Sequence, residues 1–186
     1  MRSALRYDAE NGDDKAVIAF RPLVQDDLPL LHTWLQQSHV KRWWRDRDTL
    51  EDVEAHYLPA ILGIEPTDHY VVELDGRAIG MLQTYRATDY AADWPVGARP
   101  GDAGVDILIG EPEFVGRGLG PQILRLFVDE IVFADAGVNA VIAGPDVRNT
   151  SSIRAFEKAG FRRLREVAVP GEEAAELLMQ FDRTSP

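Results

Sequence analysis

The stretch VDILIGEPEFVGRGLG, Val105 to Gly120, joins an apolar run to three glycines at alternate positions. The apolar run predicts a strand, and its one acidic residue is Asp106. Gly116, Gly118 and Gly120 then open a helical pattern, where glycines let backbone N–H groups converge on an anion. The stretch therefore predicts a strand, then an anion-binding or plain glycine-rich turn, then a helix.

Two common phosphate loops do not fit these glycines. A Walker A loop needs a lysine after its last glycine, but Gly118 is followed by Leu119. A dinucleotide-binding loop needs GxGxxG after a first strand and an acidic residue about twenty positions further on. Here the pattern is GxGxG in the middle of the chain. A cradle for pyrophosphate remains, with Arg117 adding positive charge beside it.

Hydrophobic periodicity and turn signals divide the rest of the chain into strands and helices. We predict strands at residues 16–23, 69–74, 77–87, 104–110, 138–144, 161–169 and 174–181, and helices at residues 25–37, 48–62, 119–131 and 149–160. Asp75-Gly76 predicts a type I′ hairpin turn. A capping box within residues 48–52 begins the second helix, and Asn149 or Thr150 begins the last helix, which ends before Gly160. The order predicts a mixed α/β sheet.

Two further features of this pattern bear on the site. The helix after the glycines carries an apolar stripe made of Leu119, Ile123, Leu126, Phe127 and Ile131. The connection over residues 88–103 is long for a compact domain, which is typical of a functional or mobile loop.

The composition fits one globular domain. We assign residues 1–15 of the 186 to a polar N-terminal arm and residues 16–186 to the folded domain. The absence of cysteine excludes disulfides and a thiol nucleophile, and fits a cytoplasmic protein. The four histidines lack metal-binding spacing, so we expect no metal. No apolar run approaches the length of a membrane span, and we expect no membrane association.

The net charge of −11 restricts the choice of partners. It argues against nucleic acid, because phosphate binding needs a basic face. It suits a cationic substrate through long-range attraction, although many soluble proteins are acidic only for solubility.

Five sequence blocks carry a resemblance to a known family. They are WLQQSHVKRWW (residues 34–44), HYLPAIL (56–62), AIGMLQTY (78–85), VDILIGEP (105–112) and SIRAFEKAGF (152–161). Together with VGRGLG, they make the chain similar to the GCN5-related N-acetyltransferase (GNAT) superfamily, and within it to aminoglycoside 6′-N-acetyltransferases. The resemblance covers residues 20–180. It implies a single-domain GNAT fold, in which the parallel strands 104–110 and 138–144 of a mixed sheet splay apart between flanking helices.

The resemblance also implies acetyl-CoA as co-substrate. Its pantetheine arm would pair with strand 104–110, its pyrophosphate would lie on the glycine turn, and the last helix would face the arm. The implied cofactor residues are Ile107, Leu108, Ile109, Gly116, Arg117, Gly118, Leu119, Gly120, Pro121, Asn149, Ser152 and Phe156. Most members carry Gln or Arg where this chain has Phe114 and Val115, a departure that matters little if the backbone does the binding.

Acyl transfer to an amine needs a base, an oxyanion donor and a proton for the departing thiolate. Without a cysteine, direct attack in a ternary complex is the simpler scheme. Asp106 is the candidate base, because desolvation among aliphatic residues would raise its pKa; it could instead form an ordinary salt bridge. We expect the backbone N–H of Leu108 to be the oxyanion donor. Relatives protonate the thiolate with a tyrosine where this chain has Phe156, so water or another tyrosine must donate, or the thiolate leaves unassisted.

The implied acceptor is a cationic aminoglycoside. Carboxylates suit a polyamine, and aromatic faces suit cations and sugar rings. The expected substrate residues are Trp44, Tyr57, Glu65, Gln83, Asp93, Trp94 and Asp106. Of the pair Trp43 and Trp44, one is expected to be structural. Close relatives carry an aspartate where this chain has Gly144, and we expect Asp146 or the pair Glu172–Glu173 to compensate.

Three other functions remain open. Siderophore-type lysine or hydroxylamine N-acyltransferases share some blocks, but they generally place a histidine where this chain has Asp106. Acetylation of a protein N-terminus is a further alternative, and a catalytically weak drug- or acyl-CoA-binding protein would fit the missing tyrosine. The sequence allows a monomer or a homodimer.

Overall fold

The computed structural model describes residues 16–44, 48–90, 99–169 and 173–183. They group into two compact units. The first unit runs to Gln83 and takes in Ile107–Leu119, and the second comprises Thr84–Asp106 and the chain from Gly120 onward. Strands β3 and β4 pass from one unit into the other, so β4 contributes Asp106 to the second unit and the next residue to the first.

Within the described residues, seven strands form one mixed sheet in the order β1-β2-β3-β4-β5-β7-β6, which confirms the predicted α/β class. Their bounds are β1 (Ile18–Pro22), β2 (Thr67–Leu74), β3 (Arg77–Arg86), β4 (Asp102–Ile109), β5 (Ala140–Ala143), β6 (Arg162–Val167) and β7 (Glu176–Asp182). The predicted parallel pair is confirmed: residues 102–104 of β4 are in register with residues 140–142 of β5. Strand β4 continues to Ile109 beyond this register.

Three α-helices lie between β1 and β2 in the chain, and one α-helix follows each of β4 and β5. The α-helices are α1 (Leu28–Leu35), α2 (Ser38–Lys41), α3 (Leu50–Ile61), α4 (Leu119–Glu130) and α5 (Thr150–Ala159), and the 3₁₀ turns are η1 (Gln25–Asp27), η2 (Ala87–Tyr90), η3 (Pro112–Phe114) and η4 (Val132–Ala134). The four-residue helix α2 was not predicted, because it is too short to show an apolar period.

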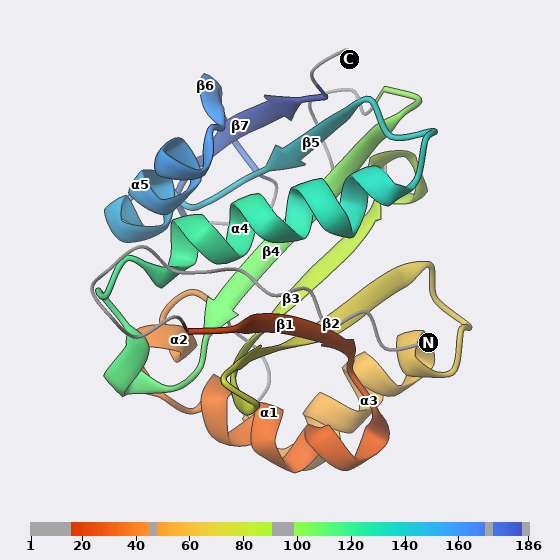
Figure 1. Ribbon diagram of the computed structural model, residues 1–186, viewed down its shortest axis with the longest axis vertical. Helices are drawn as coiled ribbons and strands as arrows, with labels where there is room; N and C mark the ends of the chain where they lie inside the picture. The colour runs from red at the N-terminus through yellow and green to blue at the C-terminus, as the bar shows by residue number, and fades with distance from the viewer. Residues whose placement is uncertain (1–15, 45–47, 91–98, 170–172, 184–186) are drawn as a thin grey trace. The chain divides into compact units, whose positions relative to one another are not determined.

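The first unit packs helices against its strands. Strands β1 and β2 pair antiparallel, and α3 packs against both β2 and α1 (Figure 1). Asp75 and Gly76, between β2 and β3, have φ values of 51° and 80°, as a type I′ turn requires. The capping box that begins α3 consists of Thr49 and Asp52, which is one of the predicted alternatives.

Large apolar side chains build the core of this unit. Its buried members are Leu23, Leu28, Leu31, Trp34, Leu35, Val40, Val53, Tyr57, Val71, Met81 and Leu108. Helix α1 contributes Leu28, Leu31 and Leu35 at helical spacing, and Trp34 beside them. The core therefore holds the end of β4 through Leu108.

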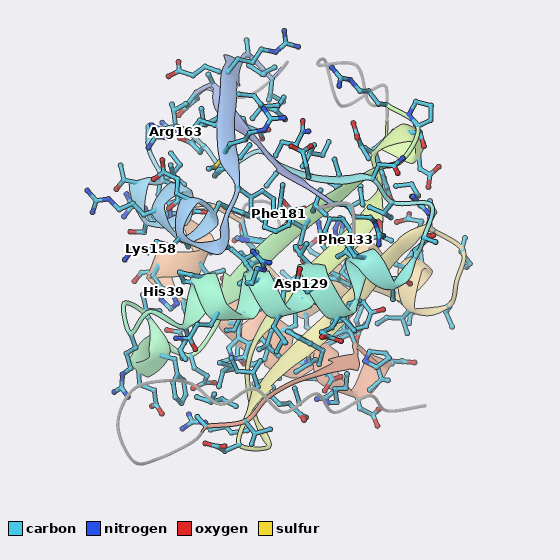
Figure 2. The ribbon with its side chains drawn as sticks, turned by 45° about the horizontal axis from the view of Figure 1, so that its top comes forward. His39, Asp129, Phe133, Lys158, Arg163 and Phe181 are labelled. Carbon is cyan, nitrogen blue, oxygen red and sulfur yellow. The ribbon has the colours of Figure 1, made fainter. Side chains whose placement is uncertain are left out.

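The second unit packs α4 and α5 with β5, β6 and β7. Contacts between neighbouring rings run from Phe133 through Phe181 and Phe161 to Phe156, with centroids 6.0, 5.4 and 5.0 Å apart. Phe133 and Phe181, labelled in Figure 2, come from η4 and β7. The guanidinium of Arg125 on α4 lies 4.9 Å from the centre of the Phe181 ring, so α4 packs against this strand. All four residues of β5 are buried.

The buried face of α4 differs from the predicted stripe. Ile123 and Phe127 are buried as expected, but Leu124 and Val128 complete the face. Leu119, Leu126 and Ile131 are only half-buried. The apolar set predicted from periodicity was therefore rotated by about one position.

Within the part of the chain that the structure describes, no helix is both long and apolar enough to cross a membrane. Across the same residues, no group of acidic or histidine side chains is placed to hold a metal ion.

Candidate functional site

Asp106 lies on β4 directly after the fully buried Val105. Its side chain is half-buried, and the following Ile107 is half-buried as well. The expectation of an acid enclosed among aliphatic residues is therefore corrected to an acid that remains partly accessible. Partial exposure allows a proton acceptor to reach an incoming amine.

The end of β4 is packed tightly in the first unit. The side chain of Leu108 belongs to the core, so only its backbone groups are left for other chemistry. A Cβ added to Gly80 on β3 would lie 2.2 Å from the Leu108 carbonyl oxygen, so the two strands can approach this closely only with glycine at that position.

His39 contacts the end of β4, which was not predicted. Its Nε2 lies 2.9 Å from the carbonyl oxygen of Ile109. His39, labelled in Figure 2, comes from α2, within the block SHVKRWW. Ile109 was expected to offer free backbone groups to the pantetheine arm, but its carbonyl already has a hydrogen-bonding partner. The block itself was the only sequence signal for this contact.

The glycine turn adopts a conformation suited to glycine. Gly116 and Gly118 have φ values of 77° and 79°, in the left-handed region that other residues rarely adopt. A Cβ at either position would meet nothing within 4 Å, so backbone conformation and not packing requires glycine. Arg117 between them is exposed, with its guanidinium carbon 5.8 Å from the centre of the Phe114 ring.

The turn leads directly into α4, which begins at Leu119. Backbone N–H groups in the first turn of a helix have no partner within the helix and carry a partial positive charge. Pro121 has no N–H, so of the expected residues here Leu119 and Gly120 can donate and Pro121 can contribute only ring contacts. Gly120 has no positive φ, and its added Cβ would lie 3.5 Å from Ala155.

Three further expected cofactor residues, Asn149, Ser152 and Phe156, belong to α5 and its N-cap. Asn149 caps the helix: its side-chain oxygen accepts a hydrogen bond from the N–H of Ser152 at 3.1 Å. Of the two residues predicted to begin this helix, Asn149 and Thr150, the N-cap is therefore Asn149. Phe156 is buried against Phe161, and Gly160 ends the helix with φ 108°, as predicted.

Asp146, one of the residues expected to compensate for Gly144, is engaged by Arg148. Both carboxylate oxygens of Asp146 accept hydrogen bonds from the Arg148 guanidinium, the shortest at 2.7 Å. An acid neutralised in this way is a poor anchor for a cationic drug. Glu173 is exposed and 3.8 Å from Arg148, and Glu172 lies outside the described residues.

Five of the expected substrate residues are described: Asp106 belongs to the second unit, and the other four belong to the first. Trp44 is half-buried and packs against the core, while Trp43 stacks with Arg42 at 4.7 Å. Glu65 is exposed beyond the end of α3. Asp93 and Trp94 lie outside the described residues.

Tyr57 and Gln83 are brought together by a residue that was not predicted, His69. Its Nε2 lies 3.1 Å from Oε1 of Gln83, and the centre of its ring lies 5.0 Å from that of Tyr57, with the two ring planes nearly perpendicular. Tyr57 is fully buried, which corrects the expectation that it reaches the acceptor directly. Gln83 is half-buried.

Comparison with known proteins connects this arrangement to acetyl transfer. Residues 24–169 match the family model of the acetyltransferase (GNAT) domain. The chain is 34% identical over 174 residues to aminoglycoside N(6′)-acetyltransferase type 1 of Klebsiella pneumoniae, which covers 90% of this chain and 86% of that protein. The crystal structure of aminoglycoside acetyltransferase AAC(6′)-Ib with coenzyme A and kanamycin superposes with a TM-score of 0.81 at 34% identity, over 89% of this chain and 95% of that one. A lysine N-acyltransferase of Mycolicibacterium paratuberculosis is 28% identical over 144 residues, 75% of this chain and 63% of that protein.

Proposed function

The chain belongs to the GNAT acetyltransferase family, and from this premise we propose that it transfers an acetyl group from acetyl-CoA to the 6′-amine of aminoglycoside antibiotics, which confers resistance. One observation supports the binding of acetyl-CoA in this proposal. Two glycines with positive φ flank Arg117 and lead from β4 into the first turn of α4. Such a turn offers N–H groups and a positive charge to a pyrophosphate.

The donor side is built from backbone and polar groups. We assign the pyrophosphate to Gly116, Arg117, Gly118, Leu119 and Gly120, with Pro121 contributing ring contact. The pantetheine arm is assigned to the backbone of residues 107–109, and to the polar side chains of residues 149 and 152 on the side of α5. Phe156, whose ring is buried, is assigned to the same side of the arm.

Acetyl-CoA supplies the acetyl group as an activated thioester. Asp106 accepts the proton that the acceptor amine loses as its nitrogen bonds to the acetyl carbon. The N–H of Leu108 donates a hydrogen bond to the carbonyl oxygen while charge develops on it. Because the chain has Phe156 in place of a tyrosine, water protonates the thiolate after the C–S bond breaks. No covalent acyl-protein step is needed, since the chain contains no cysteine.

The acceptor side uses acidic, amide and aromatic groups. Glu65, Gln83 and Asp93 are assigned to the amines and hydroxyls of the drug, and Trp44 and Trp94 to its rings. Tyr57 supports Gln83 from the core through His69. A cytoplasmic location completes the proposal, because acetyl-CoA is a metabolite of the cell interior.

The proposal is tested by following thiol release from acetyl-CoA with purified protein. The acceptors are two aminoglycosides that differ only in a 6′-amine or a 6′-hydroxyl, together with lysine and an N-hydroxylated diamine. We expect turnover with the 6′-amine alone. Turnover with lysine or the hydroxylamine, and none with the drugs, would assign the chain instead to the siderophore-type acyltransferases that its 28% identity to a lysine N-acyltransferase also suggests.

A further inference from the structure

The residues that connect β4 to the glycine turn are held by three elements of the first unit. The backbone N–H groups of Gly110 and Glu111 both donate to the carbonyl oxygen of Ile79 on β3, at 2.9 and 3.2 Å. His39 on α2 lies 2.9 Å from the carbonyl oxygen of Ile109. The turn therefore starts from a fixed base.

Trp34 on α1 fills the space beside Gly110. A Cβ at residue 110 would lie 2.0 Å from the indole ring, which leaves room for no side chain larger than hydrogen. The ring is only 1% exposed and belongs to the core. The position of the chain at Gly110 is thus set by a side chain that cannot easily move.

The carboxylate of Glu111 connects the Trp34 ring to Arg77, the first residue of β3. One oxygen accepts a hydrogen bond from the indole N–H of Trp34 at 2.9 Å, and the other accepts from the Arg77 guanidinium at 2.8 Å. The side chain of Glu111 is 22% exposed and that of Arg77 is 52% exposed, so the pair is shielded from solvent on the Glu111 side. A buried indole N–H needs an acceptor, and Glu111 provides it.

Arg77 carries the connection onward to the glycine turn. A second nitrogen of its guanidinium donates to Glu113 at 2.5 Å, and its guanidinium carbon lies 5.3 Å from the centre of the Phe114 ring. The guanidinium of Arg117 lies 5.8 Å from the same ring. A continuous series of contacts thus leads from the core, through Glu111 and Arg77, to the cation of the glycine turn.

We propose that Trp34, Glu111 and Arg77 form a clamp that positions the glycine turn and Arg117 for the pyrophosphate of coenzyme A. This inference rests on the proposed function, in which that turn binds acetyl-CoA. The three are positioning residues: they act on the ligand through the turn. A turn with two glycines loses much conformational freedom when it orders around a ligand, and a clamp that restrains it beforehand reduces that loss.

The test compares Glu111→Gln with a matched control, Glu73→Gln. Both replace a carboxylate paired to an arginine at 2.8 Å within the first unit, but Glu73 pairs with Arg21 on β1. Calorimetry with coenzyme A alone gives the dissociation constant, and steady-state kinetics give kcat and both KM values. For Glu111→Gln we expect the dissociation constant and the KM for acetyl-CoA to rise about tenfold, while kcat at saturation and the KM for the aminoglycoside change less than about twofold. Glu73→Gln should change none of the four values.

A second variant, Phe114→Leu, tests the far end of the clamp without altering the core. It removes the ring between Arg77 and Arg117, and it should raise the dissociation constant by a smaller factor of about three. Equal dissociation constants for wild type, Glu111→Gln and Phe114→Leu would overturn the clamp. So would a loss of kcat with unchanged coenzyme A binding. If wild-type protein binds coenzyme A but acetylates no aminoglycoside, the proposed acceptor is wrong, and the calorimetry still decides on the clamp.

Discussion

Asp106 is the residue on which the proposed chemistry depends most. Strand β4 places it one residue before the segment assigned to the pantetheine arm, and its side chain is half-buried. This position suits a proton acceptor that must meet both a thioester and an amine. Asp102 begins the same strand and accepts a hydrogen bond from the N–H of Arg99, so it serves as a comparison.

Asp106→Asn should leave coenzyme A binding intact and lower kcat by about a hundredfold or more, because it removes a general base. The measurements are steady-state rates with a 6′-amino aminoglycoside and calorimetry with coenzyme A. Asp102→Asn, which removes a carboxylate from the same strand, should keep nearly full kcat. An unchanged kcat/KM in Asp106→Asn would remove Asp106 from the mechanism.

A second carboxylate, Asp27, makes stability depend on pH. Burial alone would raise the pKa of Asp27, but hydrogen bonds from Arg21 and from the N–H of Val24 outweigh it and lower the pKa below its ordinary value. A carboxyl with a lowered pKa stabilises the fold above the unfolded-state pKa of about 4, and this stabilisation is lost as pH falls through the folded-state pKa.

Asp27→Asn should therefore lower the free energy of unfolding by about 1–3 kcal/mol at pH 7. The difference from wild type should shrink as pH falls below about 4. Urea titrations across this range measure it, with Asp26→Asn at an exposed neighbouring position as the control. A difference that stays constant with pH would show that the charge of Asp27 contributes nothing.

Tyr57, His39 and Glu111 show why the candidate site could be predicted only in part. The resemblance made Asp106 and the glycine turn candidates from contiguous residues. It could not indicate that Tyr57 lies in the core, or that His39 contacts a carbonyl seventy positions away in sequence. Glu111 lies within the block VDILIGEP, but no sequence pattern indicated its contacts, because its partners come from α1 and β3. Contacts between distant segments depend on packing, which sequence periodicity does not specify.

Helices, strands and turns were predicted best where local chemistry determines them. The hairpin turn at Asp75-Gly76 and both ends of α5 follow from residues that prefer those backbone conformations. Helix α2 was missed because it is one turn long and is held by the burial of Val40. The face of α4 was misplaced because half of its buried residues, such as Leu124, are adjacent to the predicted stripe.

Two substitutions in the turn before α4 distinguish the effect of backbone strain from the effect of contact with the ligand. Gly118→Ala places a Cβ on a residue with φ 79°, which should cost about 1 kcal/mol or more of folding stability and weaken coenzyme A binding. Gly120→Ala has no such strain, and its methyl group would meet Ala155 at an ordinary 3.5 Å, so stability should stay within about 0.5 kcal/mol of wild type.

Thermal unfolding and coenzyme A titration of both variants provide the check. Weaker binding by Gly120→Ala at unchanged stability would indicate that its backbone lies against the ligand. Equal stability of Gly118→Ala and wild type would contradict the requirement for glycine in the turn.

The charge of the whole chain acts on its two substrates in opposite directions. With 31 acidic and 20 basic residues, the protein attracts a polycationic acceptor and repels the phosphates of acetyl-CoA. The glycine turn must therefore supply its positive field locally, through backbone N–H groups and Arg117. Kinetics can measure this difference between attraction of the acceptor and repulsion of acetyl-CoA, which follows from the proposed function.

Raising the ionic strength should lower kcat/KM for the aminoglycoside by up to about tenfold, because salt screens the attraction that brings the cation to the protein. The range from about 0.01 M to about 0.15 M shortens the screening length from about 30 to about 8 Å. Over the same range kcat/KM for acetyl-CoA should rise or stay level. A parallel decline for both substrates would point to salt acting on the fold and not on steering.

The position of the acetyl group on the product tests the proposed 6′-N-acetylation most directly. An aminoglycoside with amines at several positions, including 6′, is turned over with isotopically labelled acetyl-CoA, and the product is mapped by NMR and mass spectrometry. We predict a single acetyl group, on the 6′ nitrogen, whose formation is lost in Asp106→Asn. Acetylation at another amine, acetylation spread over several amines, or no acetylated product would contradict the proposed function.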